Sequence, residues 1–436
     1  MSTADRHSIE PALYSLWDCG GETAVKHYDV IVIGAGIIGL SIAWQLTRRS
    51  RLKIAVLEKG GSIGEGSTGA SSAVCRYRYT LDMTLNLARD GIHAYRHWRE
   101  FTGLERPRAK FQQTGVLWMP GSDREWADRE HTRMQGHGIA TEVLDDAELR
   151  RRFPALSGCT TVPDVETGAT HDCRGEGLHL LEVEGGYMDP VDTLEDLREA
   201  CIGGGICVRM NTRVTAALLS GGRVSGVRLA DGMELSSPLV VNAAGPWCRD
   251  LMRSVGLEHD WELVPTRVQT VYLDRPEELP GHIPTCVDMG SGIYFRTQNR
   301  GQQLLVGSVL ERDEREAVAD PDAFQREPDD DFLHRVLHML HHRIPGLPYT
   351  GKVRGYCGLY TVNRNDVHPL VGPTAVEGFW VANGFSGHGF KLGPAIGSMV
   401  ARGITGVSTS FDAGEPLSGL SIERSPIPLE SKTVLA

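Results

Sequence analysis

The stretch YDVIVIGAGIIGLSIAWQLTRR, residues 28–49, decides the fold of this chain. The apolar run 30–33 is typical of a buried strand, three glycines follow it, and the apolar periodicity beyond them indicates a helix. A second apolar run, KIAVLEKG at 53–60, ends on Glu58, about twenty residues beyond the last of these glycines. A glycine turn between a strand and a helix, followed at this distance by an acid, predicts a dinucleotide-binding unit.

Each residue of this motif has its own expected role. Gly34 permits a tight turn, Gly36 lets the backbone approach a pyrophosphate at the helix N-terminus, and Gly39 lets helix and strand pack closely. Glu58 is expected to accept hydrogen bonds from an adenosine ribose. The motif does not distinguish NAD from FAD, so both remain open at this point.

Composition sets limits on the kind of protein. The chain has 436 residues, 23% charged and 41% hydrophobic, and a formal net charge of −11. These values predict a globular protein of two or three domains, and they argue against a nucleic-acid or membrane partner, since an anionic partner requires a large basic face. Apolar runs stay below the ~18 residues that span a bilayer. Residues 1–27 read as a polar arm rather than a signal peptide, so we expect a cytoplasmic protein.

The cysteines give little sign of a metal centre. Nine cysteines lie singly along the chain, which is typical of a reducing compartment. Cys159, His171 and Cys173 come closest to a cluster, but they lie in a loop-like stretch and lack the fourth ligand of a zinc site. We therefore predict no metal.

In two further stretches, glycines and other small residues suggest that the backbone lies directly against a ligand. The stretch GGSIGEGSTGASSAVCRYRYT at 60–80 is rich in glycine and small hydroxyl residues, which is typical either of a loop against a flat polyphosphate cofactor or of a flexible surface loop. The stretch PLVVNAAGPWCRDL at 238–251 predicts a buried strand that breaks at Gly245 into a helix. Between them, Gly-Gly at 221–222 and Asp-Gly at 231–232 predict hairpin turns.

A second glycine-dense turn, GFSGHGFKLG at 384–393, lies between a predicted strand, FWVAN at 379–383, and a predicted helix from 391. The N-terminal amides and the positive end of this helix therefore face whatever lies against the turn. They would stabilise negative charge there.

These motifs, in this order, resemble the D-amino-acid-oxidase-like flavoproteins, and most of all the branch of monomeric sarcosine oxidase and dimethylglycine dehydrogenase. The resemblance covers roughly residues 28–405 and rests on GAGIIG, Glu58, the serine-rich loop ending in Arg76, GGYMDP, VVNAAGPW and GFSGHGFKLG. It implies an α/β fold in which a Rossmann-like, GR2-type FAD-binding domain is interleaved with an α+β substrate domain built on a mixed sheet. The implied FAD domain comprises 28–80, 181–260 and 351–405, the substrate domain 81–180 and 261–350, and the C-terminal tail 406–436.

The resemblance also implies the residues that contact FAD. Both glycine turns are expected to meet on the cofactor, one at the pyrophosphate and the other at the isoalloxazine ring. The implied contacts are Gly34, Gly36, Ile37, Ile38, Gly39, Glu58, Lys59, Ser67, Thr68, Ser71, Ser72, Val214, Ala244, Gly245, Trp247, Gly358, Gly387, His388, Gly389, Phe390 and Lys391.

Three residues are implied in catalysis. Arg76 and Lys391 fall on the two positions that hold the substrate carboxylate in sarcosine oxidase, and an arginine fork with a lysine charge suits a carboxylate. The alternatives are a surface salt bridge for Arg76 and a solvent-facing side chain for Lys391. His388 either donates to the flavin ring or is a turn histidine bonded to backbone.

The chain departs from the sarcosine oxidase pattern at several positions. Leu305 stands where that family has an oxygen-activating lysine, and Val309 where it has a pocket histidine. The place of the covalent flavin cysteine is Gly358, and strand alternation points the neighbouring Cys357 to the opposite face, so FAD is expected to be noncovalent. Two further residues, Tyr294 and Arg296, are expected in the pocket-lining sheet or as packed strand residues.

Together these features predict an FAD-dependent oxidoreductase that removes hydride from the carbon next to a secondary or tertiary amine bearing a carboxylate. Oxygen or another carrier would accept the electrons. Oxidation of a 2-hydroxy acid and a non-catalytic assembly or binding flavoprotein are the alternatives. The sequence shows no obvious base, and the insertion-like stretch 155–180 is expected at the pocket rim.

Overall fold

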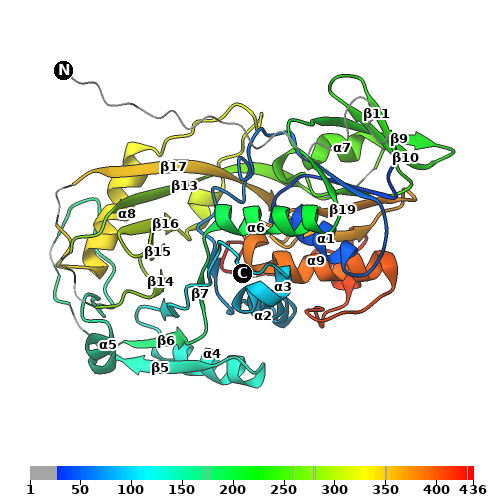
Figure 1. Cartoon of the computed structure of the whole chain (residues 1–436). Helices are drawn as coiled ribbons and strands as arrows, with labels where there is room; N and C mark the ends of the chain where they lie inside the picture. Colours follow the sequence, from blue (N-terminus) through cyan, green and yellow to red (C-terminus); the bar gives the residue numbers. More distant parts are fainter. Residues whose placement is uncertain are drawn as a thin grey trace, which may run out of the picture.

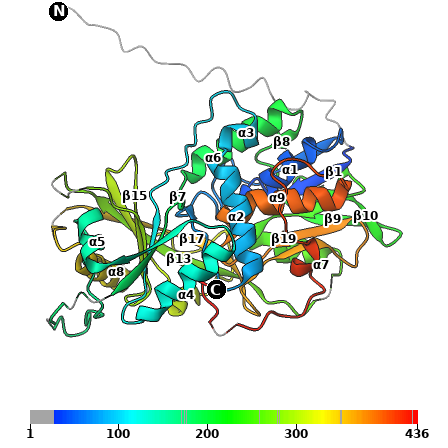
Figure 2. The same ribbon diagram turned by 90° about the horizontal axis from the view of Figure 1, so that it is seen from below.

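The computed structural model describes residues 27–436 except 170, 174, 176, 258, 278, 280, 349, 350 and 430. The predicted polar arm lies almost entirely outside these residues. Two large sheets organise the chain, and Figures 1 and 2 both show them in separate halves of the molecule.

The first sheet has six strands and is parallel except at one edge, where β18 runs antiparallel to β19. Its inner strands are buried on both faces, which explains why they are continuous apolar runs rather than alternating ones. In spatial order they are β18 (Leu370–Pro373), β19 (Phe379–Asn383), β12 (Val240–Asn242), β1 (Val30–Ile33), β2 (Ile54–Leu57) and β8 (Cys207–Arg209).

Helices cover one face of this sheet and a small sheet lies towards the other. Helix α1 (Ile37–Thr47) packs against α9 (Gly389–Thr405) and α6 (Pro190–Gly203), as Figure 1 shows. The opposite face packs against α7 (Cys248–Ser254) and an antiparallel sheet of β9 (Val214–Ser220), β10 (Arg223–Leu229) and β11 (Glu234–Ser236). The turns before β10 and β11 fall at the predicted Gly-Gly and Asp-Gly dipeptides, so both hairpins are confirmed.

The second sheet has eight strands and is mixed, since β14 and β4 pair in parallel and the other neighbours are antiparallel. Helix α8 (Asp330–Arg343) packs on one of its faces. In spatial order the strands are β17 (Val353–Asn363), β13 (Leu263–Asp274), β16 (Gln303–Ser308), β15 (Ile293–Gln298), β14 (Thr285–Asp288), β4 (Val116–Met119), β6 (Leu178–Glu182) and β5 (Thr141–Asp145). The two sheets confirm the predicted α/β class with a mixed second sheet.

Smaller elements join the two halves. The two-stranded ribbon of β3 (Val74–Cys75) and β7 (Gly186–Tyr187) follows the serine-rich loop. Helix α2 (Asp82–Arg96) packs against α9, and its Gly91 touches the backbone of Lys391, although the sequence assigned residues 81–180 to the substrate domain. The remaining helices are α3 (Trp98–Thr102), α4 (Arg124–Gly136) and α5 (Asp146–Arg152), with 3-10 turns at Gly245–Trp247, Glu311–Glu314 and Leu417–Leu420. The division into two domains stays a prediction.

Candidate active site

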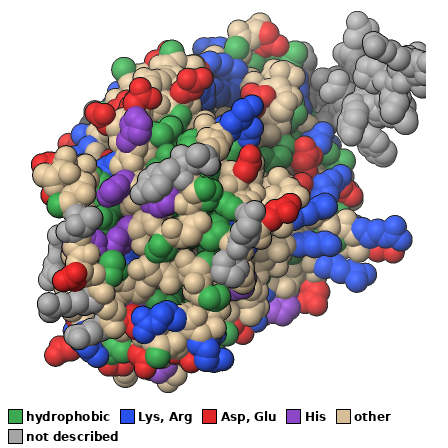
Figure 3. Space-filling view, turned by 90° about the vertical axis from the view of Figure 1, so that its left-hand side faces the viewer, with side chains coloured by type: hydrophobic (Ala, Val, Ile, Leu, Met, Phe, Trp, Pro, Cys, Tyr) green, Lys and Arg blue, Asp and Glu red, His purple; other side chains and the backbone are tan. Residues whose placement is uncertain are grey.

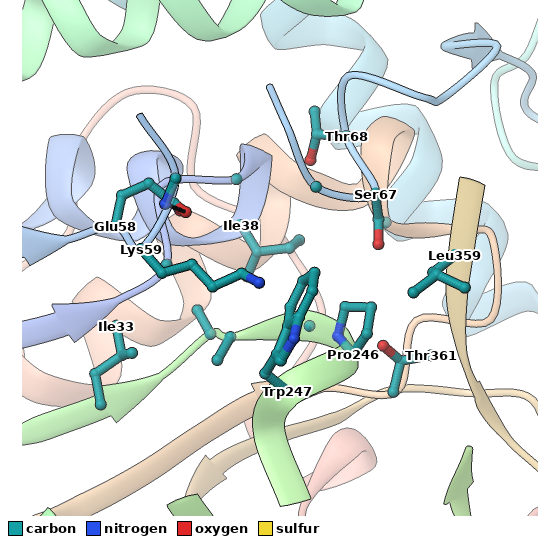
Figure 4. Close-up of a pocket in the computed structure, with 18 of the residues that line it drawn as sticks. Ile33, Ile38, Glu58, Lys59, Ser67, Thr68, Pro246, Trp247, Leu359 and Thr361 are labelled. Carbon is teal, nitrogen blue, oxygen red and sulfur yellow. Dashed lines mark hydrogen bonds between the residues drawn. The ribbon is translucent and has the colours of Figure 1, made fainter. Parts of the chain in front are cut away.

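A cavity of about 640 Å³ lies where the two glycine turns meet. Both turns line it, together with the serine-rich loop, the turn after β12 and strand β17. Figure 4 draws 18 of the lining residues and labels ten, which come from several separate elements. Of the residues implied in FAD contact, the cavity is lined by Gly34, Gly36, Ile37, Ile38, Glu58, Lys59, Ser67, Thr68, Ser71, Val214, Ala244, Gly245, Trp247, Gly387, Gly389 and Phe390. The other five, which are not among its described lining residues, are Gly39, Ser72, Gly358, His388 and Lys391.

The first glycine turn is fixed by close approaches of backbone to backbone. Gly34 has φ +103°, and a Cβ there would lie 2.6 Å from the carbonyl oxygen of Ala243. A Cβ at Gly39 would overlap the carbonyl oxygen of Gly34, so this glycine serves packing between helix and strand, as predicted, and not the cavity. Gly36 caps α1 in extended conformation, and its neighbour Ile37 donates its N–H to Oγ1 of Thr68 at 3.1 Å.

Glu58 is held by the same turn. Its Oε2 accepts from the N–H of Ala35 at 2.8 Å, and its Oε1 accepts from the N–H of Gly60 at 2.8 Å. A carboxylate oxygen can accept more than one hydrogen bond, so Glu58 retains the capacity to accept from a ribose hydroxyl as well. The backbone bonds fix the direction in which the carboxylate points.

A charged cluster around Asp322, which the sequence did not reveal, lines part of the cavity. Lys59 pairs with Asp322, and its Nζ lies 3.6 Å from the ring centroid of Trp247, towards which it reaches in Figure 4. Asp322 also accepts from Nε1 of Trp247 at 3.1 Å and from Arg213 at 2.9 Å. Asp322 and Arg326 both line the cavity, but they come from a loop between β16 and α8 that carries no recognisable motif.

The second glycine turn immediately precedes α9 and lines another part of the same cavity. Gly387 has φ +86°, and a Cβ there would lie 2.7 Å from the ring of Tyr360 and 2.8 Å from Cγ2 of Val434. His388 is the N-cap residue of α9, so the first N–H groups of this helix lie next to Gly387 and Phe390, which line the cavity. The turn can therefore place partial positive charge beside a ligand.

Arg76, His388 and Lys391 gather around the buried ring of Tyr79. The guanidinium carbon of Arg76 lies 4.1 Å, and Nζ of Lys391 6.0 Å, from the centroid of that ring. The His388 ring meets it edge-on at 5.0 Å. All three side chains are buried, so Arg76 is not a surface ion pair and Lys391 does not face solvent. The structure brings the three predicted catalytic residues together, just beyond the lining of the cavity.

Burial changes the charge states of two of them. Burial, and secondly the charge of Arg76, lower the pKa of Lys391 to about 7. Burial, and secondly the charge of Lys391, hold the pKa of His388 well below its usual range, so the imidazole is neutral. Its Nε2 lies 3.1 Å from the carbonyl oxygen of Val434, which can only accept, so the ring proton is on Nε2.

The last residues of the chain reach into this cluster. The carbonyl oxygen of Val434 accepts hydrogen bonds from both Arg76 and His388, and that of Leu435 accepts from Arg78 at 3.0 Å. Figures 1 and 2 place the C-terminal end of the chain between the two halves. A protein oxygen atom thus occupies Arg76, one of the two residues that the resemblance assigned to a substrate carboxylate, whereas Lys391 donates to the carbonyl oxygen of Gly387 at 3.4 Å.

Glu314 is a second residue that the sequence did not reveal. Its Oε2 accepts from the N–H of Val434 at 3.0 Å, while its buried Oε1 has no hydrogen-bond partner within the described residues. Burial raises the pKa of Glu314 to about 8, so it is mainly protonated at neutral pH. The surrounding sequence ERDERE, at 311–316, is typical of a charged surface stretch, so Glu314 was not predicted as a site residue.

The departures from the sarcosine oxidase pattern lie in the second sheet. Leu305 is buried on β16 opposite Arg296 of β15. Arg296 donates to the carbonyl oxygen of Ser72 at 2.7 Å, so it fastens the serine-rich loop to the sheet. Tyr294 also hydrogen-bonds Ser72. Val309 is buried just beyond the end of β16.

The two candidate positions for a covalent flavin bond, Cys357 and Gly358, are adjacent residues of strand β17. The thiol of Cys357 lies beside Arg267, with which it hydrogen-bonds, and Cys357 is not among the described lining residues. A Cβ at Gly358 would meet that of Ala70 at 2.7 Å, so Gly358 packs against the serine-rich loop. Leu359 and Thr361, further along the strand, do line the cavity.

The insertion-like stretch 155–180 lies elsewhere. Its described residues do not line the cavity between the glycine turns, whereas Val165 and Glu166 line a separate cavity beside α8. In the part of the chain that the structure describes, helices long and apolar enough to cross a membrane are absent.

Comparison with known proteins agrees with this architecture. Residues 29–402 match the FAD dependent oxidoreductase family, DAO, and the chain belongs to that family. It is 25% identical over 419 residues to FAD-dependent oxidoreductase domain-containing protein 1 of Xenopus laevis, covering 88% of this chain and 80% of the relative. It is 26% identical over 397 residues to sarcosine oxidase subunit beta of Rhizobium meliloti, covering 86% and 85%.

Among solved structures, L-proline dehydrogenase from P. horikoshii is similar, with a TM-score of 0.76 at 22% identity over 91% of this chain and 97% of that one. The family resemblance is thereby confirmed, and the protein is an FAD-dependent oxidoreductase. The cavity fits this cofactor, since it combines a glycine turn at a helix start, an acid at the end of β2 and a second helix start in one continuous space.

Proposed function

We propose that the protein oxidises the C–N bond of a small secondary or tertiary amine that carries a carboxylate, such as an N-methyl or cyclic amino acid. The observation that carries this proposal is the buried cluster of Arg76, His388 and Lys391, in which Arg76 and His388 already donate to the carbonyl oxygen of Val434. A buried arginine fork beside a lysine, with a neutral histidine as a further donor, suits a carboxylate ligand.

The FAD would lie along the cavity without a covalent bond. Gly34, Gly36 and the N-terminus of α1 would hold its pyrophosphate, and Glu58 its ribose. The turn at Gly387 would face the isoalloxazine, which supplies a hydride acceptor when bound. The position of Cys357 beside Arg267 supports noncovalent attachment.

Arg76 and Lys391 would orient the substrate by its carboxylate so that the carbon next to nitrogen faces the cofactor. Their positive charges would also lower the pKa of the substrate ammonium, as Arg76 lowers that of Lys391. The amine would then bind in its neutral form, with its nitrogen lone pair available, and the step requires no strong protein base. Glu314, protonated at neutral pH, would serve as a hydrogen-bond donor rather than as a base.

A relative supports the amine over other substrates with the same carboxylate. Sarcosine oxidase subunit beta, 26% identical to this chain, is named for an N-methyl amino acid. The carboxylate cluster itself does not distinguish an amine from a hydroxyl, so the test must include both.

The test is anaerobic bleaching of the bound flavin by N-methylglycine, dimethylglycine, proline, pipecolate and lactate. Bleaching by at least one of the amines, with lactate inert, is the expected result. Bleaching by lactate alone would make the protein a 2-hydroxy acid oxidoreductase. Failure of every compound, with FAD fully bound, would favour a non-catalytic flavoprotein.

The electron acceptor is expected to be a carrier other than oxygen. Leu305 supplies no charge to stabilise a developing superoxide, so reoxidation of the reduced flavin by air should be slow. Stopped-flow reoxidation of wild type, Leu305→Lys and the neutral control Leu305→Met measures this. Fast reoxidation of the wild type would contradict the expectation without affecting the amine chemistry.

A further inference from the structure

Three potential metal ligands, Cys159, His171 and Cys173, form one cluster within the stretch 159–179. Nε2 of His171 lies 3.3 Å from Sγ of Cys159 and 3.5 Å from Sγ of Cys173. The three ligand atoms all lie within 4.8 Å of one another. Cys159 is buried, His171 is half-buried and Cys173 is exposed, so the cluster is reachable from solvent on one side.

These separations match those within a zinc site. Zinc binds thiolate at about 2.3 Å and imidazole at about 2.0–2.1 Å in a tetrahedron, so its sulfur and nitrogen ligands lie about 3.5 Å from each other. Two thiolates and an imidazole form a soft donor set, which favours zinc over calcium or magnesium. The sequence alone left a fourth ligand unidentified.

The end of α8 supplies a fourth ligand. The ring centroid of His342 lies 5.0 Å from that of His171. Nε2 of His342 is buried and has no hydrogen-bond partner among the residues that the structure describes. An unpaired buried imidazole nitrogen is costly, and coordination to a metal would satisfy it.

The same helix end also positions Cys159. Arg343 pairs with Asp288 through two hydrogen bonds of 2.6 and 3.0 Å, and both side chains are fully buried. Arg343 also donates to the carbonyl oxygens of Ser157 and Cys159. One rigid helix terminus therefore holds the backbone of Cys159 and places His342 beside His171, so the ligands have a preformed support.

We propose that Cys159, His171, Cys173 and His342 bind a zinc ion that fastens the stretch 159–179 to the end of α8. None of these residues is among the described residues lining the cavity between the glycine turns, so the role of the ion is structural. It would close the loop between Cys159 and His171 and hold it against the second sheet. The proposal does not depend on the substrate or on the catalytic step.

The test uses the full-length holoprotein without an affinity tag, because α8 carries further histidines and Figure 3 shows histidine side chains gathered on this side of the molecule, where added tag histidines would compete for metal. Reduced protein is stripped with a chelator, reloaded with zinc and dialysed, and its zinc is measured by mass spectrometry. We expect close to one zinc per chain. Cobalt in place of zinc should give the thiolate charge-transfer band of a tetrahedral site.

Matched variants test which side chains bind the zinc and which residues are only neighbours of the site. Cys173→Ser changes an exposed side chain, so it should fold and bind FAD normally while losing the zinc and the cobalt–thiolate band. His342→Gln should weaken zinc binding by about tenfold or more, whereas His338→Gln on the same helix should leave it unchanged. Cys286→Ala, which removes a cysteine outside the cluster, should retain the zinc.

Metal removal gives a second readout. Stripped wild-type protein should keep its flavin but become sensitive to proteolysis within 160–170, and zinc should restore resistance. Zinc that stays with Cys173→Ser, or a reduced wild type that binds none, would overturn the proposal. A stable disulfide between Cys159 and Cys173 that persists in the isolated protein, with no zinc bound after its reduction, would do so as well. Unchanged affinity in His342→Gln would exclude His342 as the fourth ligand.

Discussion

The two glycine turns look alike in sequence but are determined by different neighbours. The turn at 34–39 is enclosed mainly by backbone, with the carbonyl oxygens of Ala243 and Gly34 where Cβ atoms would lie. The turn at 384–389 is enclosed by side chains, among them Tyr360 and Val434, and it leads into the buried charges around Tyr79. The first turn is therefore required mainly for the packing of β1 against α1. The second turn lies beside the residues that we propose to bind the substrate.

The largest expected effect is at Gly39. A Cβ in Gly39→Ala overlaps a carbonyl oxygen that cannot move without displacing β1, so the variant should lose FAD and about 3 kcal/mol or more of stability. Gly203→Ala in α6, where a Cβ meets nothing within 4 Å, is the control and should be neutral or slightly stabilising. Urea unfolding and flavin content measure both. Normal FAD binding in Gly39→Ala would contradict the backbone account of the first turn.

Arg76 provides the next largest effect. Removing its charge-assisted hydrogen bond to a substrate carboxylate in Arg76→Met should cost about 1.5–3 kcal/mol, or about one to two decades in the efficiency of anaerobic flavin reduction. Arg76→Lys keeps the charge but not the fork, so it should recover only part of the loss. Substrates amidated at the carboxylate are the control, because they should react poorly and equally with all three proteins. If acid and amide lose the same factor, Arg76 does not bind the carboxylate.

Deleting residues 433–436 should have a smaller effect. The deletion removes the carbonyl oxygen that occupies Arg76 and His388, so KM for an acidic substrate should fall by about five- to tenfold. Lys432→Ala, which changes an exposed neighbour, is the control. A large rise in KM would instead show that Val434 builds the pocket wall. Steady-state kinetics with an artificial electron acceptor distinguish these outcomes.

A further expected effect is the pH dependence at Lys391. Because burial and Arg76 lower its folded-state pKa to about 7, the unfolded chain binds one more proton between about pH 7 and its usual pKa of about 10.4. This difference in bound protons makes the folded protein more stable as the pH rises through that range. The same pH dependence is absent from Lys391→Met. Urea unfolding at pH 6 to 9 should therefore show wild type gaining stability relative to the variant. Parallel pH profiles would mean that Lys391 titrates normally.

Local patterns predicted the first turn almost completely. The strand, the glycines, the helix and Glu58 lie within about thirty residues, as such units do, and each acts through local backbone geometry. The resemblance then identified Arg76, His388 and Lys391, which the structure brings together around Tyr79. Asp322 and Glu314 were missed because each lies in a polar stretch without periodicity, and its importance comes from what it packs against.

From the sequence alone, the dinucleotide motif and its strand–turn–helix unit could be derived, because they depend on local periodicity and on glycines that only certain backbone conformations require. The family came from the resemblance of the ordered motifs. Tertiary structure decided that Lys391 is buried beside Arg76, that the carbonyl oxygen of Val434 occupies their neighbourhood, and that His342 lies beside His171. These three facts involve residues between about 40 and 360 positions apart along the chain. Burial and interactions between charges depend on distances in space, so local sequence patterns do not predict them.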